Sequence, residues 1–134
     1  MIEYIEHIAR DYVRKNPHKV FLFGDNLIRT GWGCQAKEMR GEPNAVGIPT
    51  KKKPDMTEDS FFTDDELWEN KKAIDNAFMD IFIVKHDIEK SGKKPVVVIP
   101  KAGLGTGLAE LPTRAPKTYQ YLLTRLKEFE GDLK

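Results

Sequence analysis

The sequence has one cysteine, Cys34, among its 134 residues, so no disulfide can form within the chain. So little cysteine suits a reducing compartment, and we expect a cytoplasmic protein. Long hydrophobic runs are lacking as well. Charged residues interrupt the apolar positions of residues 1–15, which argues against a signal peptide and a membrane span there.

The charge balance argues against another class of partner. With 22 basic and 21 acidic residues the formal net charge is +1, whereas nucleic-acid-binding domains usually carry a clear basic excess. We therefore expect neither nucleic acid nor a membrane as a partner. The hydrophobic fraction of 40% and the charged fraction of 32% suit one globular domain over residues 1–134. Three scattered histidines and one cysteine predict no metal site, and no cofactor is expected.

Hydrophobic periodicity predicts alternating helices and strands. Apolar residues at helical spacing predict an N-terminal helix at about residues 2–15, and a capping-box pattern at residues 63–66 opens a long helix. Short apolar runs rich in β-branched residues predict strands near residues 20–23, 45–48 and 95–100. This alternation predicts an α/β fold with three α/β/α layers, a mostly parallel (mixed) sheet and helices on both faces. One or two further strands are expected within residues 50–62 or near a terminus.

Two of the predicted strands end in loops that contain several glycines. Parallel sheets bind ligands outside the carboxyl ends of their strands, and glycine lets the backbone N–H groups approach a phosphate closely. The spacing at residues 103–107 is neither the Rossmann fingerprint nor a Walker A loop. The alternative is a flexible connection, but three alternating glycines exceed what a turn needs. The predicted ligand-binding residues are Gly24, Asn26, Gly31, Trp32, Gly33, Lys51, Pro100, Gly103, Leu104, Gly105, Thr106 and Gly107.

Several polar residues near these loops have two interpretations each. Asp25 and Asn26 follow a strand and could bind an adenine amino group or a ribose hydroxyl, or they could form an Asx turn. The lysines at residues 51–53 suit a diphosphate or a solvated loop. Trp32 stands between two glycines and is a candidate wall for a base. Cys34, at the start of a predicted short helix, is interpreted as a small packing residue.

The succession of these segments resembles the macrodomain family. The resemblance rests on residues 20–26, on Gly31-Trp32-Gly33, on residues 45–53, and on residues 96–108 with their glycine loop. Within that family, residues 48–54 look most like the branch that removes terminal ADP-ribose from acidic side chains. The whole pattern is also similar to small uncharacterised proteins of bacteria and phages.

The resemblance implies that the two loops bracket the diphosphate and distal ribose of ADP-ribose, either free or attached to a protein. If the protein is an ADP-ribosyl hydrolase, attack at the anomeric carbon needs a positioned nucleophile or base. The candidates are Asp25 first, then Glu110 and one of the lysines at residues 51–53. The alternatives are a non-catalytic module that binds ADP-ribose, NAD or a cyclic nucleotide, and an interaction domain whose site is empty.

Overall fold

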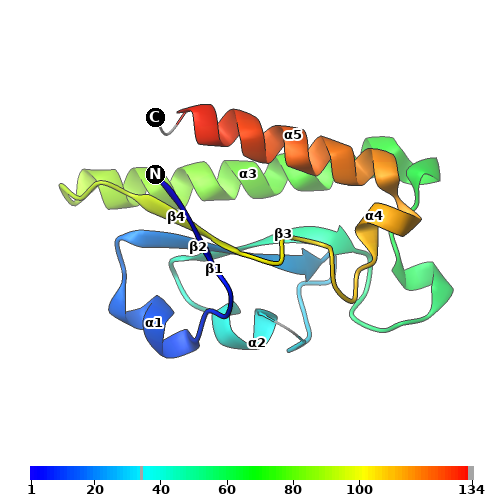
Figure 1. Cartoon of the computed structure of the whole chain (residues 1–134), viewed down its shortest axis with the longest axis horizontal. Helices are drawn as coiled ribbons and strands as arrows, with labels where there is room; N and C mark the ends of the chain where they lie inside the picture. Colours follow the sequence, from blue (N-terminus) through cyan, green and yellow to red (C-terminus); the bar gives the residue numbers. More distant parts are fainter. Residues whose placement is uncertain (34, 133–134) are drawn as a thin grey trace.

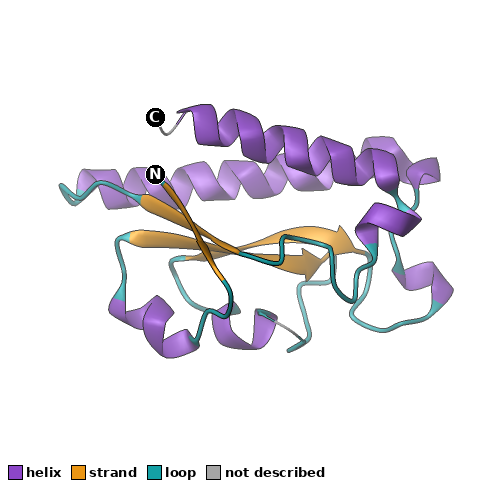
Figure 2. Ribbon diagram, viewed as in Figure 1, coloured by secondary structure: helices purple, strands orange, loops and turns teal. Residues whose placement is uncertain are grey.

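The computed structural model describes residues 1–33 and 35–132 and contains a four-stranded sheet in which every neighbouring pair is parallel (Figures 1 and 2). The strand order is β1-β4-β2-β3. Its strands are β1 (Ile2–Ile5), β2 (Lys19–Asn26), β3 (Ala45–Lys51) and β4 (Val96–Pro100). The predicted α/β class with a mostly parallel sheet is confirmed, although no antiparallel strand makes the described sheet mixed.

Helices cover both faces of this sheet. The long helices α3 and α5 lie together on one face, and the short helices α1 and α2 lie on the other (Figure 1). The helices are α1 (Arg10–Lys15), α2 (Ala36–Met39), α3 (Leu67–Lys90), α4 (Leu111–Arg114) and α5 (Pro116–Asp132), with 3-10 turns η1 (Glu58–Ser60) and η2 (Asp64–Glu66). No helix in the described residues is long and apolar enough to cross a membrane.

Strand β2 is buried on both faces because its successive side chains alternate between the two helical layers. Leu22 packs into the core beneath α3 and α5, whereas Phe21 and Phe23 pack against α1 and α2. All three side chains are almost fully buried. This double coverage explains why the run is continuously apolar rather than alternating.

The predicted helix at residues 2–15 is wrong over its first half. Residues Ile2–Ile5 form β1, which pairs in parallel with β4, and helix α1 begins only at Arg10. Apolar residues at positions 2, 5 and 8 fit a helix by spacing, but β4 offers an open edge whose backbone groups need partners. Pairing with that edge overrides the local pattern, and β1 is one of the further strands expected near a terminus.

The edge strand β3 is protected against pairing with another strand. Pro49 has no N–H to donate, which confines it to an edge position. The guanidinium of Arg29 also donates a 2.6 Å hydrogen bond to the carbonyl oxygen of Gly47. These two features leave β3 few free groups for a fifth strand.

Residue Asp64, which belongs to the predicted capping box, caps a different helix from the one expected. Thr63 makes no side-chain hydrogen bond at the start of the long helix. The carboxylate of Asp64 instead accepts hydrogen bonds from the backbone amides of Lys117 and Thr118, in the first turn of α5. The buried side chain of Asn70 joins α3 to the same hydroxyl-bearing residue, Thr118. The two long helices are therefore tied together near their N-termini.

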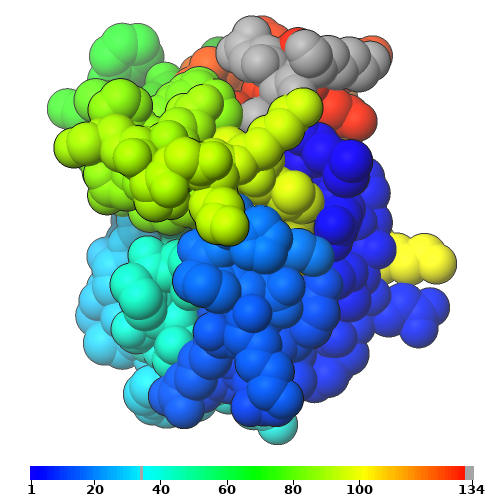
Figure 3. Space-filling model, turned by 90° about the vertical axis from the view of Figure 1, so that its left-hand side faces the viewer, coloured from blue at the N-terminus to red at the C-terminus, as the bar shows by residue number. Residues whose placement is uncertain are grey.

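The two ends of the sheet differ in what forms their surface. Figure 3 shows the end at which β2 and β3 begin, where α1 and the turn between α3 and β4 form the surface. The opposite end, where the strands finish, carries the long loops that follow β2, β3 and β4 (Figure 1).

Candidate functional site

A pocket of about 430 Å³ opens at the carboxyl ends of the strands and is lined by both glycine loops. Strands β2 and β4 are neighbours in the sheet, so the loops that follow them meet although they are far apart in the sequence. The predicted site residues that line the pocket are Gly24, Asp25, Asn26, Gly31, Gly33, Lys51, Pro100, Gly103, Gly105, Thr106 and Gly107.

Three predicted site residues do not line this pocket. The Trp32 side chain is 63% exposed and lies outside it. Leu104 is 3% exposed and belongs to the core beneath α3 and α5. Glu110 precedes helix α4, where its carboxylate lies 3.6 Å from Nε of Arg114.

The second glycine loop, residues 101–108, brings the backbone close to the end of β2. Gly105 has a φ of +77°, and a Cβ there would lie 3.0 Å from the side chain of Leu111. A Cβ at Gly24 would lie 3.6 Å from the Gly105 nitrogen, so the two chain segments nearly touch. Within the described residues, the backbone amides of residues 104–109 donate to no protein acceptor. The loop therefore presents a row of amides beside the pocket.

The first glycine loop, residues 24–33, is held by the side chain of Asn26. The Oδ1 atom of Asn26 accepts hydrogen bonds from the amides of Ile28 and Arg29, and its Nδ2 donates to the carbonyl of Thr30. These contacts form an Asx turn, which was one of the two interpretations of this residue from the sequence. Gly31 then takes a φ of +98° and lies against Pro54 of the loop after β3.

The predicted catalytic residue Asp25 sits in an ion-pair network. Its side chain is 2% exposed, and both carboxylate oxygens accept hydrogen bonds from the guanidinium of Arg40. Arg29 donates to one oxygen over 3.1 Å, and the Asn26 amide donates to the other over 2.8 Å. A Cβ at Gly47 would lie 2.5 Å from Oδ2 of Asp25, so only glycine leaves room for this carboxylate. The arrangement is that of a structural ion pair, because these donors occupy the oxygens that a general base would use.

Of the three adjacent lysines, Lys51 alone lines the pocket among the described residues. Its ammonium donates a hydrogen bond to the carbonyl of Asp55 and lies 4.7 Å from the ring centre of Phe61. Burial lowers the pKa of Lys51, with a nearby Arg114 adding to the shift and acidic neighbours opposing it. Lys52 and Lys53 are paired with Glu66 and Asp59, respectively, so they match the solvated-loop interpretation better than a diphosphate site.

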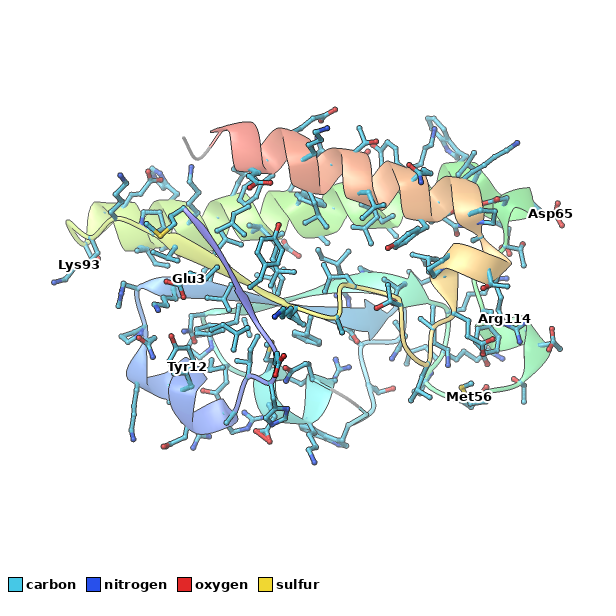
Figure 4. The ribbon with its side chains drawn as sticks, viewed as in Figure 1. Glu3, Tyr12, Met56, Asp65, Lys93 and Arg114 are labelled. Atoms are coloured by element: carbon cyan, nitrogen blue, oxygen red, sulfur yellow. The ribbon has the colours of Figure 1, made fainter. Side chains whose placement is uncertain are left out.

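A charged cluster outside the pocket lining surrounds Phe61, whose ring also contacts Lys51. The guanidinium of Arg114 lies 3.6 Å from the ring centre of Phe61 and 2.9 Å from a carboxylate oxygen of Glu58. Figure 4 labels Arg114 and Met56, which lie at the end of the molecule where the strands finish. Glu110 completes the cluster and has a φ of +49°, a left-handed conformation that is unusual for a residue with a side chain.

The remaining chemical predictions concern cysteine and metal. Cys34 lies outside the described residues. In residues 1–33 and 35–132, no three His, Cys, Asp or Glu side chains are arranged to hold a metal ion.

Several pocket residues were missed at the sequence level, namely Glu6, Thr30, Gln35, Ala36, Arg40, Thr50, Pro54, Ala102, Leu108 and Ala109. Thr50 could have been found, because it lies at the end of a predicted strand beside Lys51. Glu6 was missed because residues 2–15 were predicted to form a helix rather than a strand that ends at the pocket. Arg40 carried no local signal, because its partner Asp25 lies on a different element.

The family comparison covers most of the chain. Residues 3–125 match the model of a family of unknown function, DUF7831, and the chain belongs to that family. No curated protein and no solved structure matches the chain.

Proposed function

We propose that the pocket binds a nucleoside diphosphate, with ADP-ribose or a close relative as the ligand. The observation that carries this proposal is the convergence of two glycine loops, from adjacent strands, on one pocket. In the part of the chain that the structure describes, the amides of residues 104–109 in one of these loops donate to no protein acceptor. Consecutive free amides form an anion-binding surface.

The pocket also has the size and polarity for a nucleotide. Its volume of about 430 Å³ lies within the usual range for small-molecule sites. Glu6 lines one part of the pocket, and its carboxylate, which lies 3.8 Å from the ammonium of Lys101, is suited to accept a hydrogen bond from a base amino group. The hydroxyl of Thr50 lies at a strand end in the same pocket; it donates to the carbonyl of Asp25, and its oxygen is suited to accept a hydrogen bond from a ribose hydroxyl.

The resemblance to macrodomains supports the same ligand. It rests on the order of segments: a strand followed by an Asn-containing glycine loop, and a later strand followed by a Pro100-x-x-Gly103-x-Gly105 loop. Both loops border the pocket. The fold also has an early strand, β1, and the pocket residue Glu6 follows it directly.

Hydrolysis of an ADP-ribose conjugate is the second candidate function. The observation that favours it is Lys51, which lines the pocket and whose pKa is lowered by burial, so its amine loses a proton more readily than an ordinary lysine. Asp25 is occupied by two arginines, so hydrolysis would depend on Lys51, with Glu110 beside the same cluster. A pure binding module needs only the two loops.

The test is thermal unfolding with ADP-ribose, NAD, AMP and inorganic phosphate in parallel. A marked stabilisation by ADP-ribose and little by AMP or phosphate is the expected result. No stabilisation by any of the four would refute the nucleotide site and leave an interaction domain. Turnover of an ADP-ribosylated peptide, compared between wild type and Lys51→Met, separates hydrolysis from binding alone.

A further inference from the structure

The guanidinium of Arg40 connects one carboxylate and two consecutive carbonyl groups. Its Nε donates to the carbonyl of Gly31 over 2.9 Å, and its Nη2 donates to the carbonyl of Thr30 over 3.1 Å. Both terminal nitrogens also bind Asp25. The side chain is 15% exposed and borders the pocket. One arginine therefore fixes the orientation of two successive peptide groups in the first glycine loop.

These two contacts determine where the neighbouring amides point. In a trans peptide the C=O and the following N–H point in opposite directions. With the carbonyls of Thr30 and Gly31 turned toward Arg40, the amides of Gly31 and Trp32 face away from it. Neither amide donates to an acceptor among the described residues. The side chain of Asn26 holds the carbonyl of Thr30 from a second direction.

Asp25 explains why the guanidinium stays in this position. Its buried carboxylate binds both terminal nitrogens of Arg40, and the missing side chain of Gly47 makes room for it. Charge-assisted, two-point contacts of this kind are the strongest hydrogen bonds that an arginine makes in proteins. Four of the five N–H donors of Arg40 are engaged with protein acceptors, so its guanidinium is poorly suited to bind a phosphate directly.

We infer that Arg40 is a positioning residue, held by Asp25, that turns the amide of Gly31, in the pocket lining, and the amide of Trp32, just beyond it, away from the guanidinium to form a second anion-binding surface at the edge of the pocket. This inference rests on the proposed function, because it assigns the source of the first loop's anion affinity. It also gives Asp25 a role other than the catalytic one first predicted from the sequence.

The test compares Arg40→Lys with a matched control, Arg10→Lys. Lysine keeps the positive charge beside Asp25 but cannot bind two carbonyls and both carboxylate oxygens at once. Arg10 makes the same types of contact, to the carboxylate of Glu42 and to the carbonyls of Lys37 and Arg40, but it does not line the pocket. Calorimetric titration with ADP-ribose is done well below the unfolding temperature of each variant.

We expect Arg40→Lys to weaken ADP-ribose affinity by about tenfold or more, the scale of one lost charge-assisted hydrogen bond, and Arg10→Lys to change it by less than about twofold. Unchanged affinity in Arg40→Lys, or equal losses in both variants, would overturn the inference. A structural role alone would lower stability in both variants without separating their affinities.

A second measurement works even if ADP-ribose does not bind. Inorganic pyrophosphate is titrated while the backbone amide signals of Gly31 and Trp32 are followed by NMR. Both signals should shift in the wild type, and the shifts should be lost in Arg40→Lys. If pyrophosphate leaves both amide signals of the wild type unchanged, the inference is refuted. If these signals shift with pyrophosphate but ADP-ribose does not bind, only the proposed ligand is refuted.

Discussion

Substitution of Gly107 by glutamate should abolish ligand binding without disturbing the fold. Gly107 lines the pocket, its φ is not left-handed, and a Cβ there would meet nothing within 4 Å. The new side chain therefore has room on the protein side but occupies the pocket and adds a negative charge beside the amides. Gly105 is a poorer choice, because its φ of +77° and its close neighbours would make any side chain strain the loop.

The expected magnitude follows from ligand-linked stability. A ligand at about 100 times its Kd adds roughly 2.7 kcal/mol to the unfolding free energy of the wild type. With an unfolding entropy of roughly 2 cal/mol/K per residue over 134 residues, this raises the Tm by about 10 °C. The same ADP-ribose concentration should leave the Tm of Gly107→Glu unchanged.

The matched control for this experiment is Gly131→Glu. Gly131 also has an ordinary φ and an open surrounding, but it lies near the end of α5, away from the pocket. This variant should keep the full ligand-dependent rise. If Gly107→Glu keeps the rise as well, the pocket is not the binding site. If both variants lose it, added charge rather than occupation of the pocket is responsible.

Four further changes test the physical basis of the site and of the loop beside it. Gly105→Ala should lower the unfolding free energy by about 1–2 kcal/mol through its left-handed backbone, measured by denaturant titration; an equal stability to wild type would contradict the backbone argument. Asp25→Ala leaves Arg40 without its buried partner and should cost about 3–5 kcal/mol, whereas a loss below about 1 kcal/mol would show that the ion pair is not structural. The pKa of Lys51 is lowered in the folded state, so the unfolded state binds more protons just below pH 10.5. The unfolding free energy of the wild type should therefore rise with pH in that range relative to that of Lys51→Met. Parallel pH profiles of the two proteins would argue against burial of the amine. Hydrogen bonds from Ser60 and Thr57 lower the pKa of Asp55 to about 2. The stability that its carboxylate contributes is therefore present above about pH 4 and should vanish as the pH falls toward 2. The difference in unfolding free energy between wild type and Asp55→Asn should disappear over the same range.

The sequence predicted the sheet better than it predicted the chain's N-terminus. The runs around residues 20–23, 45–48 and 95–100 are strands because burial on both faces leaves a continuous apolar signature. The four residues of β1 have no such signature, since β1 lies at an edge and Tyr4 is 55% exposed. Its pairing with β4 is a tertiary effect that local spacing does not encode.

Glycines were easier to predict as pocket residues than charged side chains were. Glycines beyond two strand ends indicate a pocket whatever the strand order, since parallel strands finish at one edge of the sheet. The role of Asp25 depends on Arg40 and Gly47, which belong to other elements and are brought to it only by folding. A carboxylate at a strand end therefore suggested catalysis when its partners were unknown.

The distribution of charge in the pocket bears on how a chain with a net charge of +1 could bind an anion at the proposed site. The guanidinium of Arg40 is engaged with Asp25 and two carbonyls, and the ammonium of Lys51 is held against a carbonyl and an aromatic ring. Neither cation is free to act as a simple point charge. What the pocket offers to an anion is mainly the dipoles of backbone amides, which need glycine and correctly turned carbonyls rather than an excess of lysine or arginine. Net charge is therefore a poor guide to this kind of site, and the conformation of its glycines is a better one.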